Sequence, residues 1–390
     1  MADFFYRQLA KASLQEKLLP GQNIDLKVDL ALAHDGSGPE ILKLFKKKEY
    51  TINSQCRVLM TLDHSFPAPT IKDRVFQRSI SEFAQKYNIH LYKKGEGVLH
   101  QVVAEEESLW PGMIIVGADG HVATAGAFGG IAFSVSPAAF LSTICSGYYQ
   151  ISVPDQIVIA LEGGLGSAVM ARDIGMHLMY RYAHQIRGKA VLLTGATIEQ
   201  LTISEKMSIC NFLPEAGVVT ALVLPQGEER NPDITIESEK ITPMLSLPGE
   251  EPAFCSAAAC PKEAITVAIA GGCSAGRLDD MKMIADVLAK KEVHPDVTFI
   301  ITPGSKNVME SMDKLKISSI LRNGGAVIMP PGCGPCPGKH FGLLCDSDVA
   351  ITTTIRNNPG RIGAKGAKIY LASPLTVACS AVNGKITEPA

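Results

Sequence analysis

The sequence predicts an α/β protein with mainly parallel sheets, and two observations lead to this prediction. Short apolar runs rich in β-branched residues alternate along the chain with segments of helical periodicity. The runs show little alternation of apolar and polar residues, which is typical of strands covered on both faces by helices. The 35 glycines among 390 residues gather at the ends of these runs rather than in low-complexity tracts, where tight turns need them.

The expected strands are six apolar runs, at residues 57–62, 113–117, 157–161, 218–223, 266–270 and 297–301. Helical spacing is clearest in two later segments. The first has four apolar residues on one helical face, Met281, Ile284, Val287 and Leu288. The second follows Gly304-Ser305, which favours a helix start, and its pattern includes Val308, Met312, Leu315 and Leu321.

We expect three α/β domains around a cofactor-binding cleft, over residues 1–154, 155–235 and 236–390. The segment 226–252 is rich in charge and proline and has little periodic pattern, which favours an interdomain linker. A weaker break lies near 152–155, where a charge-free segment ends. That segment, 122–154, is interrupted by glycines and Pro137, so we expect a buried core segment and not a membrane span.

Composition excludes several classes of partner. The chain is 46% hydrophobic and 19% charged with a formal net charge of -2, as in a soluble globular protein, and no basic stripe suggests nucleic acid. The first residues carry no signal sequence, and ten cysteines in a chain of this length are expected to be reduced thiols. We therefore expect a cytoplasmic protein that binds neither nucleic acid nor membrane.

Three cysteines in glycine-rich settings are the strongest candidates for metal ligands. Cys273 follows an expected strand, and Cys333 and Cys336 form a CxxC sixty residues later. Three thiolates are one short of the four that close a zinc site or an all-cysteine iron–sulfur site, so the metal would keep an open coordination position. Cys255 or Cys260 could supply a fourth ligand, and a CxxC by itself also fits a thiol–disulfide protein.

Acidic and histidine residues follow several of the expected strands. Active sites in open α/β sheets lie at the carboxyl ends of strands, so these residues are candidates for acid and base chemistry. The candidates are Asp63 with His64, His100, Asp119 with His121, and Glu215, which lies four residues after Asn211. Arg356 and Arg361 frame a turn that could aim two guanidinium groups at the carboxylates of one small ligand.

Taken together, these residues resemble the aconitase family, and within it the large subunits of two-chain hydro-lyases such as 3-isopropylmalate dehydratase and homoaconitase. The resemblance covers nearly the whole chain. It rests on the order and spacing of seven groups of residues. They are His34-Asp35, Asp63-His64, Gly117 to His121, Ile209-Cys210-Asn211 with Glu215, Gly272-Cys273, Gly332 to Cys336, and Arg356 with Arg361.

The resemblance implies a 4Fe-4S cluster held by Cys273, Cys333 and Cys336, with one iron that no cysteine binds and that acts as a Lewis acid. It implies that Asp63 and His64 protonate the departing hydroxyl group. Supporting pairs would be Asp119 with His100 and Glu215 with His121. Arg356 and Arg361 would bind substrate carboxylates, and Asn211 would hydrogen-bond near the cluster.

The resemblance also implies a partner. The family's general base is a serine on a swivelling domain, in a motif resembling Tyr-Gly-Ser-Gly-Ser-Ser-Arg-Glu, which this sequence lacks. We therefore expect a small subunit that supplies this domain, and a small hydroxy acid as substrate. The alternatives are a 2,3-dimethylmalate dehydratase or homoaconitase large subunit and, from another class, a non-catalytic metal or thiol protein.

The sequence departs from the family pattern at several polar positions. Gly120 replaces a serine, and Ile355 replaces an asparagine. Ala275 and Gly276 stand where the family pattern Cys-Thr-Asn-Ser-Arg has its asparagine and serine. Because polar side chains are lost near a small-acid site, we expect an altered and less polar substrate.

Overall fold

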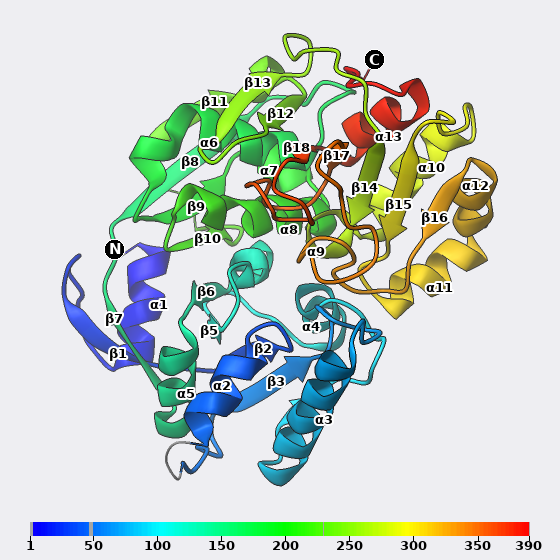
Figure 1. Ribbon diagram of the computed structural model, residues 1–390. Helices are drawn as coiled ribbons and strands as arrows, with labels where there is room; N and C mark the ends of the chain where they lie inside the picture. Colours follow the sequence, from blue (N-terminus) through cyan, green and yellow to red (C-terminus); the bar gives the residue numbers. More distant parts are fainter. Residues whose placement is uncertain (1–2, 47–49, 229, 390) are drawn as a thin grey trace.

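The computed structural model describes residues 3–46, 50–228 and 230–389. Within them the chain forms a five-stranded, a four-stranded and a seven-stranded sheet, and a separate two-stranded ribbon. The three large sheets surround the centre of the molecule (Figure 1). At this centre, α9 lies opposite the end of the five-stranded sheet that is next to α4.

The five-stranded sheet has the order β4-β3-β2-β5-β6, and all of its pairings are parallel. Its strands are β2 (Leu30–His34), β3 (Arg57–Thr61), β4 (His90–Leu91), β5 (Ile114–Gly117) and β6 (Ile131–Ser134). The helices that connect them are α2 (Gly38–Phe45), α3 (Ile71–Lys86), α4 (Leu99–Glu106) and the 3-10 helix η1 (Val122–Phe128), and α5 (Pro137–Ser146) follows β6. Beside this sheet lie α1 (Phe4–Ser13) and the antiparallel ribbon of β1 (Asn23–Lys27) and β7 (Tyr148–Ser152).

The four-stranded sheet has the order β10-β9-β8-β11 and is also parallel. Its strands are β8 (Gln156–Glu162), β9 (Ala190–Thr194), β10 (Thr220–Val223) and β11 (Ile234–Glu237). Its helices are α6 (Ala171–Ile186), α7 (Ala196–Gln200), α8 (Ile203–Phe212), η2 (Leu213–Ala216) and η3 (Ser238–Lys240).

The seven-stranded sheet has the order β13-β12-β18-β17-β14-β15-β16. It is parallel except that β12 runs antiparallel to β13 and β18. Its strands are β12 (Met244–Leu247), β13 (Ala253–Ser256), β14 (Val267–Gly271), β15 (Thr298–Thr302), β16 (Ala326–Ile328), β17 (Val349–Thr352) and β18 (Lys368–Ala372). Its helices are α9 (Gly272–Ala275), α10 (Leu278–Leu288), α11 (Lys306–Lys314), α12 (Ile317–Asn323) and α13 (Pro374–Asn383).

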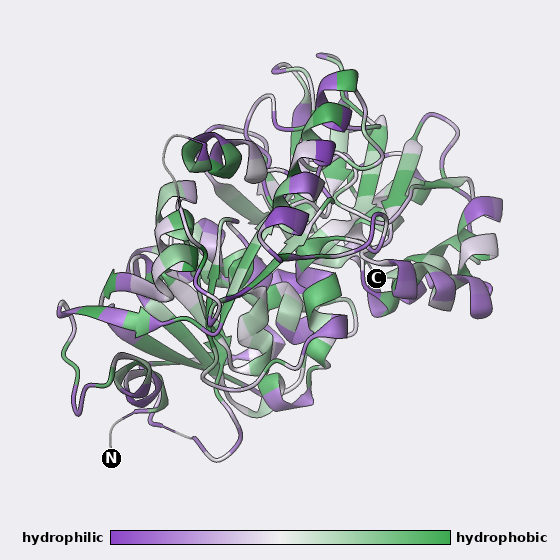
Figure 2. Ribbon diagram, turned by 90° about the horizontal axis from the view of Figure 1, so that it is seen from below, coloured by the Kyte–Doolittle hydropathy of each residue, from purple (hydrophilic) through white to green (hydrophobic). Residues whose placement is uncertain are grey.

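The predicted class, α/β with mainly parallel sheets, is confirmed, and a strand lies in each of the six predicted runs. The central strands are buried on both faces, as their continuous apolar runs indicate. Figure 2 shows the hydrophobic strands in the interior and hydrophilic residues concentrated on peripheral helices. No helix in the described part of the chain is both long and apolar enough to cross a membrane.

Two details differ from the predictions. The helical pattern after Ser305 is two helices, because Lys316 adopts a φ of 61° between α11 and α12, and Leu315 is 53% exposed. The segment 226–252, predicted as a linker, contains β11 and β12, which belong to two different sheets. The three domain limits stay a prediction; the limit at 235 falls inside β11.

Candidate active site

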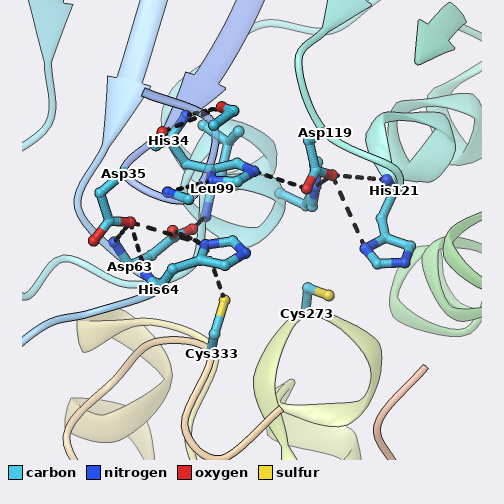
Figure 3. A network of polar contacts seen from close by, with 12 residues as sticks. His34, Asp35, Asp63, His64, Leu99, Asp119, His121, Cys273 and Cys333 are labelled. Atoms are coloured by element: carbon cyan, nitrogen blue, oxygen red, sulfur yellow. Dashed lines mark hydrogen bonds and ion pairs between the residues drawn. The ribbon is translucent and has the colours of Figure 1, made fainter. Parts of the chain in front are cut away.

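Three neighbouring parallel strands end in acidic and histidine side chains. β2 lies between β3 and β5 in the five-stranded sheet, so their carboxyl ends meet at one edge. The side chains at these ends are His34, the last residue of β2, with Asp35, then Asp63 and His64 after β3, and Asp119 and His121 after β5 (Figure 3).

Asp35 fixes the turn that carries Asp63 and His64. Its carboxylate Oδ1 accepts hydrogen bonds from the backbone N–H groups of Asp63 (3.0 Å) and His64 (2.8 Å), and Oδ2 accepts one from Ser65 (3.0 Å). All three bonds join segments from adjacent strands. Asp35 is itself buried, so it positions the neighbouring pair rather than facing the site.

Asp63 and His64 form a close acid and imidazole pair. Their Oδ1 and Nδ1 atoms lie 2.6 Å apart, while Asp63 Oδ2 accepts the backbone N–H of Leu99 at 2.7 Å, at the start of α4. Burial raises the pKa of Asp63, but His64 outweighs burial and lowers it below its usual range. Burial lowers the pKa of His64, but Asp63 and Asp35 raise it overall. The pair is therefore stabilised as carboxylate and imidazolium, and an imidazolium is a competent proton donor.

Asp119 joins two histidines from different elements. Its Oδ2 lies 2.9 Å from His34 Nε2, and its Oδ1 lies 2.5 Å from His100 Nε2 on α4. Burial raises the pKa of Asp119, but His100 and His34 lower it well below its usual range. The carboxylate thus stays ionised and fixes both imidazoles. The predicted pair of Asp119 and His100 lies within hydrogen-bonding distance in this structure.

His121, Glu215 and Arg356 form a second chain of contacts. His121 Nε2 lies 3.1 Å from Glu215 Oε1, and Arg356 Nε donates to both Glu215 oxygens, at 3.0 and 2.9 Å. Burial raises the pKa of Glu215, but His121 and Arg356 lower it to about 2. Burial lowers the pKa of His121, but Cys273 and Glu215 raise it well above its usual value. Both partners of Glu215 are therefore held as cations.

The three predicted cysteine ligands come from two segments that follow strands of the seven-stranded sheet. Cys273 lies on α9 directly after β14, and the loop with Cys333 and Cys336 follows β16. The backbone N–H of Cys333 donates to the carbonyl of Asp63 at 3.1 Å, and Cys333 Sγ lies 3.7 Å from His64 Nδ1. In Figure 3 the sulfur atoms of Cys273 and Cys333 point toward the histidines. The cysteines therefore face the acid and base groups from the opposite sheet.

Two further predicted residues contact the cysteines. Arg361 Nη2 donates to Cys336 Sγ at 3.7 Å. Asn211 Oδ1 lies 4.0 Å from Cys273 Sγ, and Asn211 Nδ2 donates to Thr124 Oγ1 at 2.8 Å. Asn211 is on the α-helix α8, whereas Glu215 is on the 3-10 helix η2 that follows it. The two residues therefore do not lie on one α-helix, as their spacing of four residues suggested.

One cavity of about 200 Å³ brings these groups together. Of the predicted site residues, all but Asn211 and Glu215 line it, and those two touch side chains that do. Cys255 and Cys260, the candidates for a fourth ligand, do not line the cavity. The described residues around it include no fourth cysteine.

Sequence reasoning missed several groups at this cavity. His34 had the same signal as His64, an imidazole at a strand end, but was not assigned a role. Gly36 lies beside both imidazoles, and Lys339 is an exposed cation on the cysteine loop. Lys339 gave no signal because a lone lysine after a CxxC cannot be distinguished from a solvated surface residue.

Comparison with known proteins decides the family. The model of the aconitase family (aconitate hydratase) matches residues 7–231 and 250–384. This chain belongs to the aconitase family. The predicted resemblance is therefore confirmed, and with it the hydro-lyase class.

Curated relatives match over almost their whole length. The 3-isopropylmalate dehydratase large subunit of Pyrococcus horikoshii is 35% identical over 95% of this chain and 96% of its own. The homoaconitase large subunit of Thermus thermophilus is 32% identical over 95% of this chain and 93% of its own. The crystal structure of Thermococcus kodakaraensis aconitase X has a TM-score of 0.52 at 13% identity, covering 90% of this chain and 87% of that one, and supports the fold alone.

The departures from the aconitase-family pattern lie at different distances from the cavity. Gly120 lines it, and a Cβ atom there would lie 3.2 Å from Arg356 Nη2. Ala275 and Ile355 are buried and do not line it. Ile355 packs in the hydrophobic core between the four-stranded and seven-stranded sheets. Of the four departures, only Gly120 lines this cavity, and the expectation of a less polar substrate stays a prediction.

Proposed function

We propose that this chain is the cluster-bearing large subunit of a hydro-lyase that dehydrates or isomerises a small hydroxy di- or tricarboxylic acid, as 3-isopropylmalate dehydratase does. The observation that carries the proposal is the shared cavity. Three thiols from one sheet face acid and imidazole pairs from another, and two guanidinium groups lie beside them. This combination suits removal of water from a carboxylic acid.

The donor set fits a 4Fe-4S cluster with one iron that no cysteine binds. Three cysteines share the cavity, and no fourth cysteine of the described chain lines it. Arg361 donates to Cys336 Sγ, and a cationic donor is a favourable neighbour for a thiolate ligand. Cys273, Cys333 and Cys336 would hold the cluster, which supplies Lewis-acid activation of a hydroxyl group when bound.

Side chains of this chain donate the proton, bind the substrate carboxylates and orient the histidines. His64, held by Asp63, donates a proton to the departing hydroxyl group from its second nitrogen. Arg361 and the free nitrogens of Arg356 bind substrate carboxylates, since Glu215 occupies only Nε of Arg356. Asp119 keeps His34 and His100 in fixed orientations, and Glu215 does the same for His121.

A small subunit completes the proposed enzyme. The curated relatives described above are named large subunits, and this sequence lacks the serine motif of the swivelling domain. We therefore assign the general base to a partner that carries this domain. Homoaconitase and 2,3-dimethylmalate dehydratase are the alternative activities, and we propose a cytoplasmic location because the thiols need reducing conditions.

The test is anaerobic reconstitution of the full chain, followed by iron and sulfide analysis and a visible spectrum. We expect about four irons and four sulfides per chain. Cys273→Ser, Cys333→Ser and Cys336→Ser should each lose the cluster, whereas Cys345→Ser, at an exposed cysteine, should keep it. Bound zinc, or no metal after a competent reconstitution, would overturn the proposal and favour a thiol or metal-binding protein. With the small subunit added, hydration of the corresponding unsaturated acids identifies the substrate.

A further inference from the structure

A buried arginine behind the cysteines has no function in the site described above. Arg172, in the first turn of α6, is 1% exposed. Its Nη2 donates to the carbonyl of Thr354, but its Nε and Nη1 are buried without a hydrogen-bond partner. A buried guanidinium with unpaired donors is costly and needs a compensating negative charge.

No carboxylate in the described part of the chain supplies that charge at short range. No Asp or Glu oxygen among these residues lies within 4.0 Å of the Arg172 guanidinium nitrogens. The neighbouring Asp173 directs its carboxylate to the backbone N–H groups of Met170 and Met244 instead. Arg277, also buried, differs from Arg172 because it donates to the backbone carbonyls of Cys273 and Ser274.

The surroundings of Arg172 connect it to the cysteine site. Its guanidinium carbon lies 4.7 Å from the ring centroid of Phe212, the residue after Asn211, whose Oδ1 is 4.0 Å from Cys273 Sγ. Arg172 also donates to the carbonyl of Thr354. The carbonyl of the preceding residue, Thr353, accepts a hydrogen bond from Ser274 Oγ on α9 at 2.6 Å. Arg172 is thus packed against the two segments that hold α9 in place.

Electrostatics agree with this position. Burial lowers the pKa of Arg172 to about 10, and the groups whose negative charge opposes the lowering are Asp173, then Cys273, Cys336 and Asp280. Two of the three predicted cluster ligands therefore act on this guanidinium. Asp173 and Asp280 compensate it only in part, because burial raises the pKa of each, to about 7 and about 6.

We propose that Arg172 is a positioning residue of the cluster site, whose buried positive charge compensates the negative charge of the thiolate-bound cluster and raises its reduction potential. This inference rests on the proposed function, because it needs a cluster on Cys273, Cys333 and Cys336. Reduction adds a negative charge to the cluster, so a fixed cation nearby favours the reduced state.

The test compares Arg172→Met with Arg172→Lys and with Arg181→Met, which removes an exposed arginine from the same helix. Each anaerobically reconstituted full chain is assayed for iron and sulfide, for the rate of iron loss to a chelator, and for midpoint potential by redox titration. We expect Arg172→Met to lose iron about tenfold faster than wild type and to have a more negative potential. Arg172→Lys keeps the charge and should stay close to wild type, as should Arg181→Met.

Unchanged potential and iron loss in Arg172→Met would overturn the inference. If Arg172→Met does not fold, Arg172→Lys decides. A lysine loses the planar stacking on Phe212 but keeps the charge, so a large negative shift in its potential would show a packing role instead. A wild-type chain without a cluster would overturn the proposed function itself, which separates the two failures.

Discussion

The imidazole rings of His34 and His64 stack face to face, with centroids 3.9 Å apart and planes inclined by 9°. His34 Nδ1 accepts the backbone N–H of Gly36 at 2.9 Å, so its proton lies on Nε2, which donates to Asp119. His34 is therefore a neutral imidazole. It can stack on a protonated His64 without repulsion between two cations, and it restricts the orientation of the proposed proton donor.

Gly36 should be essential for this stacking. A Cβ atom there would lie 2.7 Å from His34 Cε1 and 2.9 Å from His64 Cδ2, distances too short for real contacts. We expect Gly36→Ala to lower kcat by about tenfold or more, because small displacements of catalytic groups are costly, while the iron content stays unchanged. The measurement is the rate of substrate hydration by the complex with the small subunit.

Gly164→Ala is the matched control for Gly36→Ala, because a Cβ at Gly164 meets no atom within 4 Å. It should have wild-type activity. If Gly36→Ala also had wild-type activity, the stacked geometry of His34 and His64 would not matter for turnover.

Replacement of His64 tests the proton donor directly. His64→Asn removes the imidazole that Asp63 holds, so we expect a loss of about 10²- to 10⁴-fold in kcat, the range for general acid catalysis. The visible spectrum and iron content should be retained, since His64 is not a proposed ligand. His90→Asn, at an exposed histidine on β4, controls for the loss of an imidazole elsewhere. Full activity of His64→Asn in the complex would refute the assignment.

Glu215 should make the free energy of unfolding of the cluster-free chain depend on pH in the acid range. Its folded pKa of about 2 lies below the value of about 4.3 for an unfolded glutamate. A depressed pKa stabilises the fold above the unfolded value, and that stabilisation, of about 3 kcal/mol by linkage, is lost as pH falls from about 4.3 towards 2. The measurement is the urea midpoint between about pH 5 and pH 3.

Glu215→Gln should lack this pH-dependent contribution to stability, so the urea midpoint of the variant should fall less steeply with decreasing pH. Glu82→Gln, which removes a surface carboxylate paired with Arg78 on α3, should keep the wild-type slope. Equal slopes in Glu215→Gln and wild type would show that the contacts with His121 and Arg356 do not hold the carboxylate in its charged form.

The sequence by itself determined the α/β class, because buried parallel strands need continuous apolar runs that are visible without any structure. It also determined the list of reactive groups, since strand-end Asp and His residues and glycine-flanked cysteines are local patterns. Only the tertiary structure decided which groups meet. Gln226 to Pro252 shows a limit of local reading: its charge and proline predicted a linker, yet β11 and β12 form there by pairing with strands distant in sequence.

The role of Arg172 and the stacking of His34 on His64 depend on contacts between residues far apart in the chain. No local pattern distinguishes Arg172 from the exposed Arg181 on the same helix, because burial depends on what packs against each face. The pKa values of Asp119 and Glu215 likewise follow from partners on other elements. Sequence spacing fixes which side chains are available, whereas the desolvation and charge that tune them arise only when the sheets pack together.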